Sequence, residues 1–94
     1  MSEREPTWRV RGDVAWTDEA PRFVAMALSR PEMLPVSLEG PAALIWQAVS
    51  EGAGEESAVV ARVAELAGVS PEVVAEDVVA FLLELESLGL VAQG

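Results

Sequence analysis

Alternating apolar and polar residues near the start of the chain predict a strand. Between positions 7 and 17, bulky apolar side chains occupy positions of one parity, and mostly polar side chains occupy the other. The apolar set is Trp8, Val10, Val14 and Trp16. A period of two places alternate side chains on opposite faces of a half-buried strand. We therefore expect a strand over about 8–17, with Gly12 marking a bulge or a break into two pieces.

Two further strands are expected before position 40, because two turn signals separate apolar runs. Residues 18–21 (Asp-Glu-Ala-Pro) and 29–32 (Ser-Arg-Pro-Glu) have the composition of turns. The apolar runs beside them predict strands over about 22–28 and 33–38. Connections this short favour a three-stranded antiparallel meander.

Helical periodicity takes over after position 40 and predicts helices over about 41–51, 55–67 and 71–88. Pro41 suits a first helical position, and Ser70 with Pro71 forms a favourable N-cap and first-turn pair. The predicted fold class is α+β, with a three-stranded antiparallel sheet followed by three helices. This order is similar to that of winged helix-turn-helix domains, and we expect one domain over 1–94.

The third predicted helix has a wider apolar arc than packing against one core requires. Its main stripe is Val74, Val78, Phe81, Leu85 and Leu88. Val79 and Leu83 lie beyond this stripe, so that the arc is about 200° wide, against about 100° for a surface helix. Such a helix either contacts the rest of the domain on two sides or offers one apolar side to a partner.

Composition excludes most catalytic chemistry. The 94-residue chain has no Cys, His, Lys or Tyr, which removes thiol and imidazole groups, lysine chemistry and the usual zinc ligands. Neighbouring carboxylates such as Glu76 and Asp77 are expected to be solvated surface groups. No signal peptide or membrane-spanning run is visible. We expect a cytoplasmic protein that is not an enzyme and needs no metal or cofactor.

The net charge of −10 is concentrated in the helical half. Residues 1–38 hold five arginines and six acids, whereas residues 39–94 hold one arginine and ten acids. The third predicted helix has no basic residue, so it would repel a DNA backbone. A DNA-binding winged-helix regulator is therefore the least favoured alternative, and we expect no nucleic-acid partner.

Two segments resemble the PqqD-like family, the recognition elements of ribosomally synthesised and post-translationally modified peptide (RiPP) pathways. One is Gly-Pro-Ala-Ala-Leu-Ile-Trp over 40–46. The other is Asp-Val-x-x-Phe-Leu-x-x-Leu-x-x-x-Gly-Leu over 77–90. With the expected strand order, the resemblance extends from about Val14 to Val91. The PqqD-like family includes the stand-alone recognition domains of lasso-peptide pathways.

The resemblance implies a binding function. Family members bind the leader segment of a precursor peptide, which adds as a strand beside the third strand and lies against the third helix. The implied partners are this peptide and a leader peptidase or other modifying enzyme, with no membrane. By position, the implied peptide-binding residues are Met33, Leu34, Pro35, Val36, Ser37, Asp77, Val78, Phe81, Leu82 and Leu85. For Phe81, Leu82 and Leu85, a place in the core is the alternative.

Two features qualify this implied binding mode. Pro35 has no backbone N–H, which suits an edge strand but shortens or shifts the ladder that a leader could form. The acidic helical half would favour a leader with Lys or Arg near the docked strand.

The main alternative is a self-associating or scaffold domain that uses the same strand edge and helix face for another protein. This alternative leaves a homodimer open.

Overall fold

Strands come before the helices, as the periodicity predicts, and one further short strand follows the helices. The computed structural model describes residues 5–30 and 32–94. The elements in chain order are β1 (Trp8–Val10), β2 (Val14–Glu19), β3 (Arg22–Ala27), β4 (Val36–Leu38), α1 (Pro41–Ser50), α2 (Glu56–Ala67), α3 (Pro71–Ser87) and β5 (Val91–Gln93). The expected fold class is confirmed, because an antiparallel sheet in the order β2-β3-β4 is followed by three helices.

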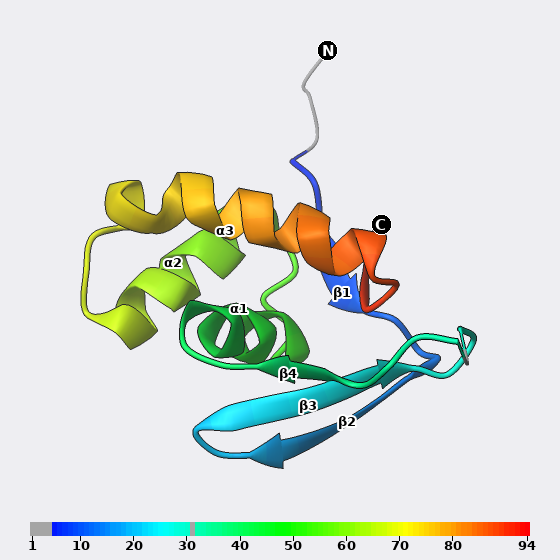
Figure 1. Cartoon of the computed structure of the whole chain (residues 1–94). Coiled ribbons are helices and arrows are strands. Elements are labelled where there is room, and N and C mark those ends of the chain that lie inside the picture. The colour runs from blue at the N-terminus through cyan, green and yellow to red at the C-terminus, as the bar shows by residue number, and fades with distance from the viewer. Residues whose placement is uncertain (1–4, 31) are drawn as a thin grey trace.

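The elements form layers (Figure 1). The β2-β3-β4 sheet is the lower layer of that view, α1 lies on it, and α3 runs across the top. The register pairs Trp16 with Ala25, and Ala25 with Val36. Paired residues share a sheet face, and Trp16 contacts Trp46 of α1 edge to face. This face therefore points to the helices, and the other face is not covered by a helix (Figure 1).

The first expected strand is two strands, so that, of the bulge and the break left open at Gly12, the structure has the break. A turn interrupts the strand at Gly12, where the N–H of Val14 donates to the carbonyl of Arg11 at 3.2 Å. β1 leaves the main sheet and pairs antiparallel with β5, with Val10 opposite Val91. β5 has three residues, too few to give a periodic signal, and its partner lies at the other end of the chain.

The third strand is shorter than the expected 33–38, and the second ends at Ala27 instead of position 28. Turns replace the ladder here, because the N–H of Arg30 donates to the Ala27 carbonyl at 3.1 Å and that of Met33 to the Arg30 carbonyl at 2.9 Å. Arg30 also donates from Nη1 to the carbonyl of Ser87 at 3.1 Å. The segment before β4 is thereby tied to the end of α3.

The helices begin and end within one residue of their expected bounds. Their apolar faces meet in one core that includes Ile45, Trp46, Val59, Leu82 and Leu85. The segment before β1 and the first residue of β1 form hydrogen bonds with the start of α2. The carboxylate of Glu5 accepts a hydrogen bond from the Ser57 N–H, and the indole Nε1 of Trp8 donates to Glu56 Oε1 at 3.1 Å.

Candidate peptide-binding site

β4 has one free edge. It pairs with β3 on one side, and within residues 5–30 and 32–94 no strand pairs with its other side. Because alternate residues of a strand direct their N–H and C=O groups to opposite edges, a free edge offers unpaired donors and acceptors. This edge is a template onto which an extended peptide could add as a further strand.

A groove of about 570 Å³ lies between this end of the sheet and α3. It is lined by Ser37, Glu39, Pro41, Ala42, Asp77, Ala80, Phe81 and Glu84. Its size falls in the range of ordinary ligand pockets. Proline, alanine and phenylalanine supply apolar surface, and three carboxylates and one hydroxyl supply the polar groups. The groove can therefore hold an apolar side chain while presenting negative charge to its neighbours.

Helical spacing explains the α3 wall of the groove. Ala80 and Phe81 lie three and four residues after Asp77, and Glu84 lies four and three residues after them, which places all four on one side of the helix. Val78, Leu82 and Leu85 point instead into the core, where all three are buried. They line no part of the groove, so the expectation that they contact a bound peptide is not supported by this geometry. Their side chains hold α3 against the rest of the domain.

The predicted peptide-binding residues at positions 33–37 do not lie together in one site. Ser37 lines the groove, so the structure brings it together with Asp77 and Phe81. Val36 is half-buried on the helix-facing side of the sheet, and Met33 is half-buried with its sulfur 4.0 Å from Arg30 Nη1. Leu34 and Pro35 are exposed, and Pro35 borders a separate hollow on the uncovered face of the sheet.

Five groove residues were missed in the sequence. Ala80 and Glu84 could have been found, because they lie three and seven positions after Asp77 on the same helix side. Glu39 follows β4, and Pro41 and Ala42 begin α1. Helical periodicity places these two residues in a helix but does not show that the helix start faces α3. The residues that widen the apolar arc do not form the groove wall, because Val79 and Leu83 are absent from the groove lining and Leu83 remains 49% exposed.

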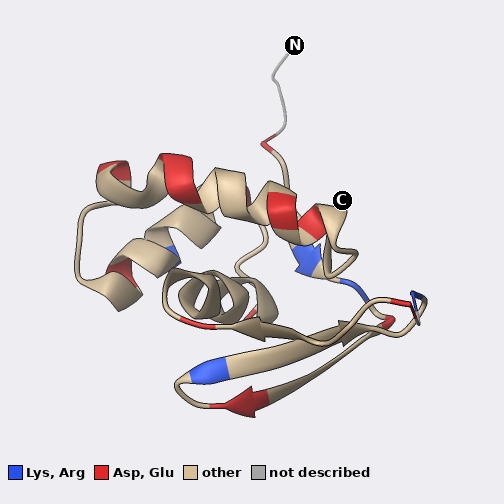
Figure 2. Cartoon of the chain, in the orientation of Figure 1, with Lys and Arg blue, Asp and Glu red and all other residues tan. Residues whose placement is uncertain are grey.

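The charged residues that line the groove are all acidic. Glu39, Asp77 and Glu84 line it, and no arginine does. Figure 2 shows acidic residues along α3 and no basic residue on that helix. The hydroxyl of Ser37 donates to Glu39 Oε2 at 3.4 Å, a long contact that leaves this carboxylate available to a ligand. A cationic group would be favoured at the rim, and an anionic group would be repelled.

In the part of the chain that the structure describes, no three acidic, histidine or cysteine residues gather as a metal site would require. None of the helices in that part combines the length and the apolar composition of a membrane span.

Comparison with known proteins gives a family. No curated protein and no solved structure matched the chain. The family model described as coenzyme PQQ synthesis protein D (PqqD) matches residues 22–91, well over half of the chain. The match includes β3, β4 and the three helices, and therefore both walls of the groove. The chain belongs to the PqqD family.

Proposed function

We propose that this protein is a non-catalytic recognition domain for the leader segment of a ribosomal precursor peptide. The leader binds by strand addition at β4 and presents the rest of the precursor to a leader peptidase or another modifying enzyme. One observation carries the proposal: in a chain of the PqqD family, the free edge of β4 adjoins a groove against α3. The free edge accounts for backbone recognition, and the groove for selection of side chains.

The shortness of β4 limits how much of the leader affinity can come from backbone hydrogen bonds. β4 has three residues and is preceded closely by Pro35, which cannot donate to a ladder. Few backbone hydrogen bonds are therefore available to a leader on this edge. Most of the selectivity then comes from an apolar leader side chain placed over Phe81, Ala80 and Ala42 in the groove.

The groove charges indicate the composition of the leader. Glu39, Asp77 and Glu84 would attract Lys or Arg on either side of the apolar anchor. Such charges raise the association rate and fix the register more than they raise affinity. An apolar residue flanked by basic residues is therefore the preferred leader motif.

Titration of fluorescently labelled leader peptides, taken from precursor genes beside this one, tests the function by anisotropy. We expect saturable binding with a Kd below ~100 μM, since weaker binding leaves little energy for recognition. Absence of saturable binding to every such leader would contradict the proposal.

Ala80→Arg tests the position of the site. Ala80 is exposed and lines the groove, so a long charged side chain there fills the space without entering the core. We expect the Kd to rise by about tenfold or more. Ala61→Arg is the matched control, because Ala61 is an exposed helical alanine on α2 outside the groove. Equal affinity of the two variants would place the leader elsewhere.

A self-associating domain is the second candidate. It is favoured by the side chain of Leu34, which is 83% exposed, and by an apolar hollow of about 210 Å³ on the uncovered sheet face, lined in part by Val24, Met26 and Pro35. Sedimentation of the protein alone distinguishes the two candidates. A tight homodimer that does not bind leaders would favour self-association, whereas a monomer that binds leaders supports the recognition function.

A further inference from the structure

We propose a second docking site, in which the hollow between the β2–β3 hairpin and α1 accepts an arginine side chain from a partner protein. The hollow has a volume of about 350 Å³. Its lining includes Trp16, Phe23 and Leu44 as apolar surface, and Asp18, Gln47 and Glu51 as polar groups. The proposal goes beyond leader recognition and does not depend on it.

Trp16 supplies an exposed aromatic wall. Its side chain is 40% exposed, whereas Trp8 and Trp46 are 2% and 0% exposed. The ring is held edge to face by Phe23 at 5.7 Å and by Trp46 at 5.8 Å between ring centroids. An indole fixed in this way has little conformational freedom to lose on binding, which is typical of aromatic anchors at protein interfaces.

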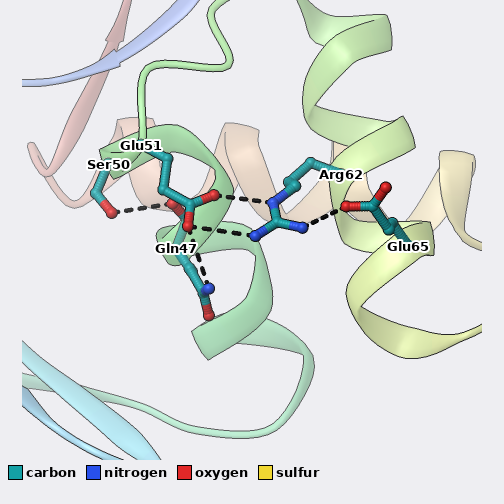
Figure 3. Close-up of polar contacts among 5 residues, drawn as sticks. All are labelled: Gln47, Ser50, Glu51, Arg62 and Glu65. Atoms are coloured by element: carbon teal, nitrogen blue, oxygen red, sulfur yellow. Dashed lines mark hydrogen bonds and ion pairs between the residues drawn. The ribbon is translucent and has the colours of Figure 1, made fainter.

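Glu51 lines the hollow and supplies a negative charge, and its polar contacts with neighbouring side chains fix its carboxylate in place (Figure 3). Arg62 of α2 donates from Nε to Glu51 Oε1 at 2.9 Å, and Gln47 donates from Nε2 to Glu51 Oε2 at 3.2 Å. These hydrogen bonds, that of Arg62 first, lower the pKa of Glu51 below its ordinary value. Arg62 also pairs with Glu65, so the cluster of two carboxylates and one guanidinium remains negative.

Asp18 supplies a second charge from the hairpin. Its Oδ1 accepts the N–H of Ala20 at 3.0 Å, which fixes the carboxylate in the turn. No arginine lines the hollow, so its charge is unbalanced within the lining. Arg22, the nearest arginine in the sequence, pairs with Glu19 at 3.1 Å.

This combination suits arginine better than other side chains. A guanidinium can stack on an indole and also donate to carboxylates, and its aliphatic stem can cover apolar surface such as that of Leu44. A neutral apolar residue would leave the charge of Asp18 without a cationic partner, and an acidic residue would be repelled. Charge complementarity therefore assigns the hollow to a cation with a planar head.

Occupation of the hollow is compatible with a peptide in the groove. The hollow uses the hairpin and α1 from Ala43 onward, whereas the groove uses Pro41 and Ala42, and the two share no lining residue. Trp16 and Asp18 also precede the range 22–91 that matches the family model. The site is thus built partly from a segment outside that match.

Amide-resolved NMR titration of the full chain with N-acetyl-L-arginine amide tests the assignment. We expect saturable shifts of the Trp16 indole N–H and of the amides of residues 18–20, with a Kd on the order of 1–30 mM for a single side chain. N-acetyl-L-citrulline amide, which has nearly the same shape and no charge, should bind about fivefold or more weakly. Equal binding of the two compounds, or shifts confined to the groove, would overturn the proposal.

Asp18→Asn separates this site from the leader groove. Asparagine can still accept the Ala20 N–H through its side-chain oxygen, so the turn is preserved while the charge is removed. We expect arginine amide to bind about threefold or more weakly to Asp18→Asn and unchanged to Asp77→Asn, the control in the groove. Leader affinity should be unchanged in Asp18→Asn, so failure of this proposal and failure of leader recognition give different results. Unchanged arginine binding in Asp18→Asn would contradict the role of the carboxylate.

Discussion

Leu82 and Leu83 are neighbours in sequence with opposite environments. Leu82 is 0% exposed in the core, whereas Leu83 is 49% exposed on the outside of α3. The resemblance to peptide-recognition domains placed Leu82 in the site, but its surroundings make it a structural residue. An arginine at Leu82 would therefore test stability and give no information about leader contacts, whereas Ala80 is a suitable position for a charged probe.

We expect Leu82→Ala to lower the free energy of unfolding by about 2–5 kcal/mol, because it leaves a cavity in the core. Leu83→Ala, the matched control, should lower it by less than about 1 kcal/mol. Urea unfolding followed by circular dichroism measures both values. Similar losses in the two variants would mean that Leu82 is not buried as described.

The pairing of Glu51 with Arg62 gives a pH dependence whose sign can be stated. Because Arg62 and Gln47 lower the pKa of Glu51 in the folded protein, ionised Glu51 stabilises the fold above its ordinary pKa of 4.5. This contribution is lost as the pH falls below 4.5 and through the lower folded value. We expect the stability difference between the wild type and Glu51→Gln to shrink between pH 6 and pH 3 in thermal unfolding. A difference that is constant or grows toward low pH would contradict this pairing.

At the scale of elements, the groove depends on how α3 and the segment before β4 meet. Arg30 bridges the two by donating to the Ser87 carbonyl, and Gly89 ends the turn after α3 with a positive φ of 77°. A Cβ at Gly89 would lie 3.1 Å from Cζ and Nε of Arg30. Gly89 therefore permits both the left-handed backbone and the close approach of the guanidinium.

We expect Gly89→Ala to lower the free energy of unfolding by about 1–2 kcal/mol, since an L-residue is disfavoured in this conformation and the Arg30 contact must shift. Gly12→Ala is the control, because Gly12 has no positive φ and an added Cβ there would meet no atom within 4 Å. Its effect should be smaller than about 0.5 kcal/mol. Denaturant unfolding of both variants gives the comparison, and equal losses would contradict the bridging role.

The elements also show what the sequence could predict. Local signals defined the helices, because Ser70 with Pro71 begins α3 and Gly68 ends α2 with a φ of 71°. The pairing of β1 with β5 escaped prediction because it joins distant, three-residue strands. Part of the groove lining could not be predicted for the same reason, since Ala42 and Ala80 are distant in sequence and come together only through the packing of the helices.

At the scale of the whole molecule, the charge distribution and the sheet topology point to one face. Among the described residues, the free edge of β4 adjoins a groove with three carboxylates. Salt should therefore weaken the binding of leaders that carry Lys or Arg, because it screens these charges. Attraction at this face would act mainly on the encounter with the leader.

We expect the combined variant Glu39→Gln, Asp77→Asn, Glu84→Gln to lose most of this salt dependence between about 0.05 and 0.5 M salt. The control variant Glu72→Gln, Glu76→Gln, Glu86→Gln changes the net charge equally, at α3 positions outside the groove lining. It should retain most of the dependence in the same anisotropy titration. Equal slopes for the two variants would show that net charge, and not the groove, is responsible.

Hydrogen–deuterium exchange with and without a bound leader tests strand addition at β4 most directly. A leader paired with the free edge gives backbone N–H groups of that edge new hydrogen bonds, which slows their exchange. We predict added protection within residues 36–38 and along the groove side of α3, with little change in β1 and β5. Protection that spares 36–38, or that is confined to the uncovered face of the sheet, would contradict leader recognition at this edge.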